Sequence, residues 1–219
     1  ERPPVCYLPS GTGNDFARTL GLTESAEHLK RALSEPGRFF SVSVGQCNED
    51  YFVNMASGGL FATVTPETSK PLKSVLGRFS YFLTGVGKLL EREPFGLRLN
   101  GGAEEKVLGF SVANARYAGG GMQIAPGADP FSGDLDFLVV PDLPATELVA
   151  LGLSLQGEKP DLASLPVRFG SAKELRLEFS RETPINLDGE QVKVKAASFR
   201  AHSGAFRIFV PEQSEGAGE

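Results

Sequence analysis

Apolar residues recur along this 219-residue chain in two patterns, one with helical spacing and one with short strand-like runs. A short apolar run at residues 5–8 predicts a strand, and a helix over 15–20 follows it, with Asn14 or Asp15 as the N-cap. Apolar residues at helical spacing predict two further helices, at 24–33 and 75–90. A third helical segment, 143–155, interrupts the strand-like runs of the second half of the chain. The 75–90 segment has the clearest apolar stripe, and its simplest interpretation is a helix packed on a sheet.

Short apolar runs separated by turn residues predict many strands. The first two cover 39–44 and 51–56, and the remaining runs lie at 96–99, 107–113, 135–140, 167–169, 175–179, 185–187, 192–194 and 206–210. Many short strands of this kind are typical of a β-sandwich or barrel. We place the passage into this β-rich part between residues 36 and 40, and a disordered polar tail at 212–219.

The composition, 41% hydrophobic and 22% charged, is ordinary for a soluble globular protein. A net charge of −5 argues against a general nucleic-acid binder, which is usually basic. No apolar run approaches the length of a spanning helix, so we expect no transmembrane segment. Cys6 and Cys47 are both flanked by apolar residues and are interpreted as reduced core thiols.

Two turns could carry chemistry. The loop from Ser10 to Asp15 is small and polar, lies between a predicted strand and a predicted helix, and so has the layout of a phosphate-binding turn. An ordinary β–α turn with an Asn cap would have the same residues. The second turn, Asp188-Gly189, predicts a tight hairpin, and on spacing alone Glu190 beside it is a solvated carboxylate.

A run of three glycines forms a third feature, in the segment 116–121. It is either a flexible hairpin bend or a loop that borders a cleft, with Arg116 and Asn114 near substrate or phosphate. Asn54 and the Gly58-Gly59 pair are expected to line the same cleft.

Five sequence blocks, in order, resemble the bacterial diacylglycerol kinase-like lipid kinases, in particular the YegS type. They are PSGTGNDFA at 9–17, FVNMASGG at 52–59, VANARYAGGG at 112–121, IAP at 124–126 and NLDGE at 186–190. The family also carries a Gly-Gly-Asp-Gly-Thr motif upstream, on its nucleotide domain, which this chain lacks.

The resemblance implies an α+β protein with the diacylglycerol kinase/NAD kinase-like fold. Residues 1–38 would be the end of an α/β nucleotide-binding domain, and residues 39–211 a β-rich, sandwich-like lipid-substrate domain. It implies ATP and Mg²⁺ as cofactors, a diacylglycerol-like lipid as acceptor, and a cytoplasmic enzyme peripheral to the membrane, and it allows a homodimer. Since most of the nucleotide domain would be missing, we expect a fragment that is inactive in isolation.

The same resemblance assigns roles to residues. Glu190 matches the general base that takes the proton from the lipid hydroxyl, and Asp15 belongs to an acidic network that holds magnesium through water. Whether Asp188 orients its turn or serves the site stays open. The residues that would contact the nucleotide are Ser10, Gly11, Thr12, Gly13, Asn14 and Asp15.

An accessory metal site implied by the family falls on Asp129, Ser132 and Asp134. Here the chain departs from the family pattern, because Ser132 and Ser43 stand where the family has aspartates. A neutral hydroxyl binds a hard cation more weakly than a carboxylate does, so this site is doubtful.

Two other functions remain open. One is a non-catalytic lipid-binding module derived from such a kinase. The other is a related two-domain kinase for a soluble substrate such as NAD, although the GTGNDF loop at 11–16 favours a lipid kinase.

Overall fold

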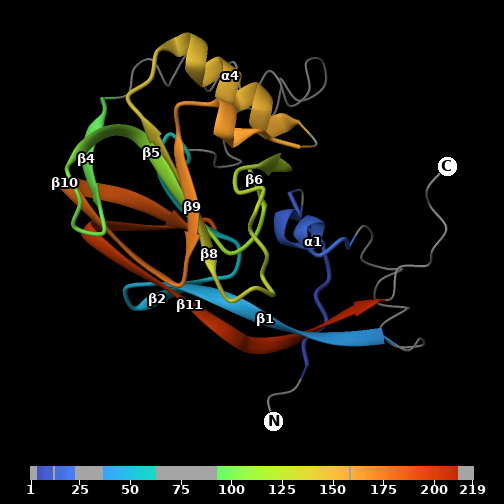
Figure 1. Ribbon diagram of the computed structural model, residues 1–219. Coiled ribbons are helices and arrows are strands. Elements are labelled where there is room, and N and C mark those ends of the chain that lie inside the picture. The colour runs from blue at the N-terminus through green and yellow to red at the C-terminus, as the bar shows by residue number, and fades with distance from the viewer. Residues whose placement is uncertain (1–3, 12, 23–36, 63–92, 158, 212–219) are drawn as a thin grey trace.

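The computed structural model describes residues 4–11, 13–22, 37–62, 93–157 and 159–211. These residues form a large antiparallel sheet with one longer helix, α4, on one side and a short helix, α1, near one end (Figure 1). The helices expected over 24–33 and 75–90, and the tail at 212–219, lie outside the described residues.

The large sheet has the strand order β2-β1-β11-β10-β3-β5-β8-β9, and β4 pairs with both β10 and β5. Its members are β1 (Gly37–Cys47), β2 (Asp50–Phe52), β3 (Met55–Gly59), β4 (Phe95–Leu99), β5 (Glu105–Ala113), β8 (Leu135–Pro141), β9 (Arg168–Ala172), β10 (Glu174–Leu187) and β11 (Glu190–Pro211). A separate hairpin joins β6 (Tyr117–Ala118) to β7 (Met122–Gln123), and the helical elements are α1 (Asp15–Thr19), α4 (Ala145–Gln156) and the 3₁₀ turn η2 (Leu162–Ser164). The expected α+β class with a β-rich, sandwich-like domain is confirmed.

The burial of each strand follows its apolar pattern. The central strand β5 is buried from Val107 to Ala113, which explains its nearly continuous run of apolar and small residues. Strand β10 alternates buried and exposed positions, as expected when one face packs on the core and the other faces water. This alternation breaks at 180–182, where the register with β11 shifts.

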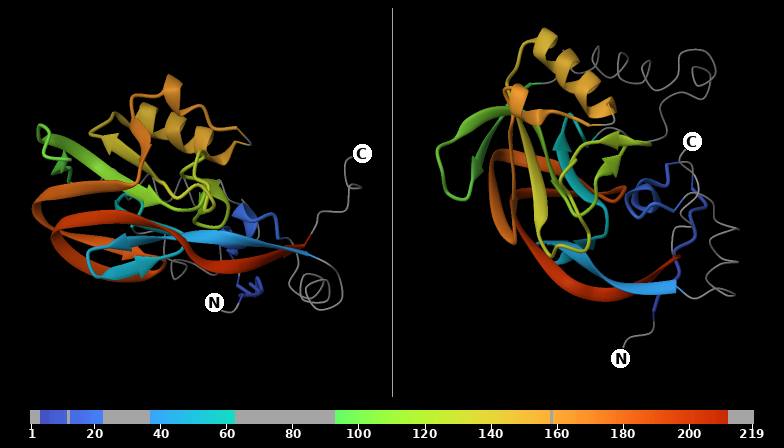
Figure 2. Two further views of the ribbon diagram at one scale, coloured as in Figure 1. Left: turned by 60° about the horizontal axis from the view of Figure 1, so that its bottom comes forward. Right: turned by 45° about the vertical axis from the view of Figure 1, so that its right-hand side comes forward.

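The described residues form three apolar clusters. The largest lies within the curved sheet and includes the fully buried Phe110 and the buried Phe199. A second lies under α4, where Leu148, Leu151 and Leu155 pack on β5 and β8. The third joins α1 to β1 and β11. In Figure 2, α4 lies at one end of the molecule, and the long β1–β11 pair of the curved sheet lies at the opposite end.

Several expectations from the sequence are wrong in detail. Residues 5–8 form no regular strand; Val5 alone makes a parallel bridge, to Ile208 of β11. The runs at 175–179 and 185–187 belong to one strand, β10, because the chain passes the irregularity at 180–182 without turning. The runs at 192–194 and 206–210 likewise belong to the single strand β11. Both cysteines carry reduced thiols as expected, but Cys6 is exposed, whereas Cys47 is buried.

Candidate active site

The loop before α1 carries most of the residues expected to bind phosphate. Asn14 has a left-handed backbone (φ 47°), and its side-chain oxygen accepts a hydrogen bond from the Gly11 N–H at 2.9 Å. Asn14 occupies the N-cap position of α1, as expected, but its side chain closes the loop and makes no capping bond to the helix. Ser10 and Gly11 are exposed, whereas Thr12 lies outside the described residues.

The glycine-rich hairpin β6–β7 packs directly on this loop and on α1 (Figure 1). The Gly120 N–H donates to the Asp15 Oδ2 at 3.0 Å. The Arg18 guanidinium lies over the Tyr117 ring, 5.7 Å from its centroid. Gly121 has φ 110°, a backbone conformation that favours glycine, and it lies close to the Arg18 side chain. The three-glycine run is thus a hairpin bend that also borders the loop at 10–15.

The β10–β11 hairpin forms as the Asp188-Gly189 pair predicts. Both residues have positive φ, 51° and 112°, and Leu187 pairs with Glu190 across the turn. Glu190 is exposed. The Asp188 carboxylate accepts hydrogen bonds from the backbone N–H groups of residues 53–55, so the turn is attached to the segment between β2 and β3.

Two asparagines connect these pieces. The Asn54 side-chain nitrogen donates to the Tyr117 carbonyl at 3.0 Å, which joins the 53–55 segment to the glycine hairpin. The Asn114 side-chain nitrogen donates to the carbonyls of Ser43 and Val53, at 2.9 and 2.8 Å. Within the described part of the chain, the Oδ1 atoms of Asn54 and Asn114 are buried without a hydrogen-bond partner.

The structure thus joins the loop of Asp15, the hairpin of Gly120, Asn54 and the turn before Glu190 by consecutive hydrogen bonds. The sequence indicated Asn54 and Asn114 as neighbours of the site, and it left open whether Asp188 orients its turn or serves the site. It missed Thr19, whose hydroxyl accepts the Arg116 N–H at 3.1 Å. A carboxylate in a tight turn after a strand was the available signal for Asp188, but the backbone donors that it binds lie more than 130 residues away.

The Arg116 side chain makes its hydrogen bond outside the loop at 10–15. It donates to the Ala128 carbonyl at 2.9 Å, toward the segment 128–136. Burial raises the pKa of the nearby Asp136 carboxyl above its usual value, and the Asp134 charge adds to this, whereas a hydrogen bond with Ser171 and the Arg116 charge lower it. The Arg116 side chain is therefore hydrogen-bonded to the segment 128–136.

The residues of the doubtful accessory metal site form a self-contained loop. The Asp129 carboxylate accepts the Phe131 N–H at 3.0 Å, and Ser132 Oγ donates to the Asp129 carbonyl at 2.8 Å. The Asp134 N–H donates to the same hydroxyl. The Ser43 N–H, at a bulge of β1, donates to the Pro130 carbonyl, so Ser43 does adjoin this loop.

Metal binding at this loop has little support from the donor set. Among the described residues no group of three or more His, Cys, Asp or Glu side chains could hold a metal ion. The Ser132 hydroxyl is already used in the turn, as donor to one backbone group and acceptor from another. We therefore derive no chemistry from an accessory metal.

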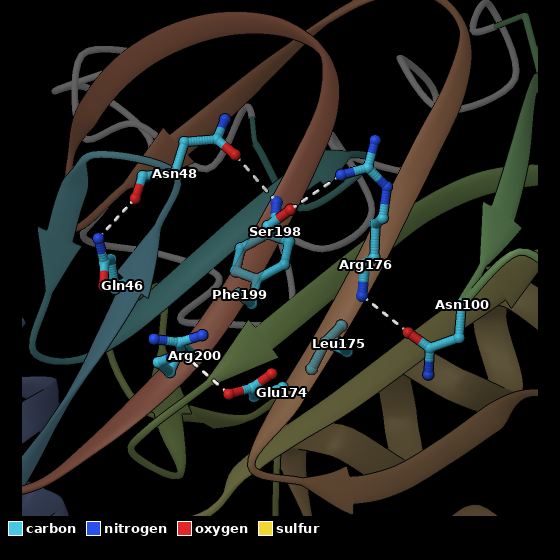
Figure 3. Close-up of a pocket in the computed structure, with 9 residues that line it drawn as sticks. All are labelled: Gln46, Asn48, Asn100, Glu174, Leu175, Arg176, Ser198, Phe199 and Arg200. Carbon is cyan, nitrogen blue, oxygen red and sulfur yellow. Dashed lines mark hydrogen bonds and ion pairs between the residues drawn. The ribbon is translucent and has the colours of Figure 1, made fainter.

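A polar hollow of about 530 Å³ lies elsewhere, on the face formed by β1, β10 and β11 (Figure 3). Its two arginines are paired with carboxylates of the same face: Arg200 with Glu174 at 2.9 Å, and Arg176 with Glu178 at 3.0 Å. Arg176 also donates to Ser198 Oγ, and its N–H donates to Asn100. These groups satisfy one another, and the hollow contains none of the residues that the sequence indicated.

In the described residues, no helix is long and apolar enough to cross a membrane. Two family models match the chain. The model of the YegS C-terminal NAD kinase beta sandwich-like domain matches residues 54–210, and that of the diacylglycerol kinase catalytic domain matches residues 1–47.

Similar proteins agree with these matches. A "Probable lipid kinase YegS-like" protein of Pseudomonas fluorescens is 34% identical over 213 residues, which cover 96% of this chain and 70% of that protein. A protein of the same name from Stenotrophomonas maltophilia is 34% identical over 220 residues, which cover 95% of this chain and 70% of that protein.

Solved structures of similar fold are also known. A crystal structure of a diacylglycerol kinase from Bacillus anthracis superposes with a TM-score of 0.72 at 24% identity, covering 96% of this chain and 70% of that chain. A second crystal structure from this organism, which also carries the diacylglycerol kinase name, has a TM-score of 0.77 at 25% identity, with coverages of 97% and 71%.

Proposed function

The chain belongs to the family of YegS-like lipid kinases, and from this premise we propose that the full-length protein transfers the γ-phosphoryl group of ATP to the hydroxyl of a diacylglycerol-like lipid. The observation that carries the proposal is the hydrogen-bonded connection between the loop of Asp15 and the turn of Glu190 through Gly120 and Asn54. It links the loop that is the candidate phosphate-binding element to the carboxylate that is the candidate general base. Phosphoryl transfer needs both a phosphate-binding element and a proton acceptor.

The loop at 10–15 would bind the nucleotide phosphates. Its residues are small, Ser10 and Gly11 are exposed, and the Asn14 side chain holds the loop closed. Small residues allow the backbone to approach an anion closely. Asp15 would hold magnesium through water, and the ion would neutralise charge on the phosphates; one or two carboxylates suffice, because Mg²⁺ usually keeps several of its waters.

Glu190 would act as the general base. It is exposed at the end of a rigid hairpin, so a lipid hydroxyl can reach it without rearrangement of the sheet. As the new P–O bond forms, its carboxylate would take the proton of the hydroxyl, while the bond from the γ-phosphorus to ADP breaks. The lipid would be presented from a membrane surface, with the enzyme bound there peripherally.

The proposal is tested with the full-length protein, ATP and magnesium, and mixed vesicles that contain diacylglycerol. We expect ATP-dependent phosphate incorporation into the lipid, and none into NAD. Phosphorylation of NAD alone would favour the soluble-substrate kinase. Vesicle binding without any phosphoryl transfer would instead favour a non-catalytic lipid-binding module.

A further inference from the structure

The Asp188 carboxylate is the centre of the hydrogen bonds that hold the turn before Glu190. Its oxygens accept the N–H groups of three consecutive residues: Val53 at 2.5 Å, Asn54 at 3.1 Å and Met55 at 2.8 Å. The Asp188 N–H in turn donates to the Met55 carbonyl at 3.1 Å. Successive N–H groups that converge on one anion form a concave binding arrangement, and bonds to a carboxylate are stronger than those between neutral groups.

The turn itself is fixed from both sides. Leu187 pairs with Ala56 of β3 on one side and with Glu190 of β11 on the other. The Asn186 side chain accepts the Gly189 N–H at 2.8 Å. The backbone on which Glu190 is carried therefore has a defined path, and the Asp188 carboxylate is the side chain that attaches this path to the 53–55 segment.

The 53–55 segment continues the connection toward the loop at 10–15. Asn54 binds the Tyr117 carbonyl of β6, and Gly120 of the same hairpin binds the Asp15 carboxylate. A shift of the 53–55 segment relative to the turn would therefore also change how the turn lies relative to Asp15.

We propose that Asp188 is a positioning residue for the phosphoryl transfer. It holds the turn of Glu190 in a fixed position relative to the loop of Asp15 and does not touch the reacting atoms. The inference rests on the proposed function of Glu190 as the base. In this proposal Asp188 takes no proton itself; it affects the reaction only by holding the turn that carries Glu190.

The test uses Asp188→Asn in the full-length kinase. Asparagine has the same size and accepts positive φ, but one acceptor oxygen becomes an NH₂ group that cannot accept backbone N–H bonds. We expect kcat to fall by about 10²-fold, as for a misplacement of a catalytic group by about 1 Å, with KM for ATP and for lipid nearly unchanged. If Asp188 acts through Glu190, the double variant with Glu190→Gln is no slower than Glu190→Gln alone.

Two further variants keep the result interpretable. Asp161→Asn is the matched control, because Asp161 also accepts a backbone N–H, from Ala163 at 3.1 Å, but lies at η2 away from this network; its kcat should equal that of the parent. Asp188→Gly removes the carboxylate while keeping a residue that adopts the required φ, and serves if Asp188→Asn melts below the assay temperature.

The outcomes are separable from those of the proposed function. A kcat of Asp188→Asn and Asp188→Gly within about threefold of the parent would overturn the inference, as would losses that multiply in the double variant with Glu190→Gln. A raised KM for ATP with unchanged kcat would also overturn it. A parent protein without kinase activity would refute the proposed function, and the positioning role with it.

Discussion

Gly58 of β3 allows close packing against the buried ring of Phe110, and its replacement by alanine should destabilise the protein through a clash with this ring. A Cβ at this position would lie 2.2 Å from Cε1 and 2.6 Å from Cζ of Phe110. Phe110 is fully buried, and its ring stacks on Phe179 with 5.3 Å between centroids. The ring cannot move away without displacing a second buried ring, so the methyl group overpacks the core.

The magnitude follows from two opposing effects. Overpacking of a well-packed core costs about 1–3 kcal/mol. Replacing glycine by alanine also removes backbone freedom from the unfolded chain, which stabilises the folded state by about 0.4–1 kcal/mol and offsets part of the overpacking cost. We therefore expect Gly58→Ala to lower the free energy of unfolding by about 1–2 kcal/mol, or Tm by roughly 2–8 °C for a chain of this size.

A double-mutant cycle tests the mechanism as well as the size of the effect. Phe110→Leu removes part of the ring that the new methyl would meet, so Gly58→Ala should cost less in that background, with a coupling of about 1 kcal/mol or more. Gly157→Ala serves as a milder comparison, because its backbone is extended and a Cβ there would lie 3.2 Å from the Ser154 carbonyl oxygen, a tight contact but without a buried ring. Urea unfolding followed by circular dichroism measures the four proteins of the cycle and the Gly157→Ala variant. A Gly58→Ala variant as stable as the parent, or strictly additive single variants, would refute the reasoning.

Two further predictions concern titratable groups. Burial raises the pKa of Asp136, so the folded protein holds this proton more tightly than the unfolded chain, and stability falls as pH rises from about 3.8 through the higher folded value. Asp136→Asn should remove this decline and raise Tm at neutral pH; a thermal-melting series from about pH 3 to pH 7 that is parallel for both proteins would contradict it. Burial, together with the nearby Asp50 carboxylate, raises the pKa of the Cys47 thiol to about 12, whereas Cys6 is exposed. A thiol reagent at about pH 8 should therefore label Cys6 alone in the folded protein and both cysteines in denaturant; rapid labelling of Cys47 in the native state would be inconsistent with its burial.

The sequence predicted the regular parts of this fold well, because period-2 burial and turn residues are local signals. The Asp188-Gly189 hairpin is the best example: both residues adopt the positive φ that the pair favours, and the flanking strands pair as expected. The helix α4 and the central strand β5 also lie where the apolar pattern placed them. The strand at residues 5–8 failed because a short apolar run does not reveal whether a neighbouring strand pairs with it along its length.

The site was predicted only in part, for a related reason. The loop at 10–15 and Glu190 could be indicated by motif, since each is a local sequence pattern. The bonds that join them connect residues far apart in the chain, such as Gly120 with Asp15 and Asp188 with Val53. The Asn14 side chain shows the same limit, because an asparagine before a helix can cap the helix or close the preceding loop, and only the backbone conformation decides between them.

Turnover of Glu190→Gln in the full-length kinase tests the central claim most directly. The amide keeps the size of the side chain but cannot accept a proton at neutral pH, so at saturating ATP and lipid kcat should fall by about 10²- to 10⁴-fold, or roughly 3–5 kcal/mol in the barrier. ATP binding and Tm should stay near those of the parent, because Glu190 is exposed and an exposed carboxylate changes stability by about 0.5 kcal/mol or less. A folded variant that turns over within about threefold of the parent would contradict the account, and Glu190 would then be a solvated hairpin carboxylate.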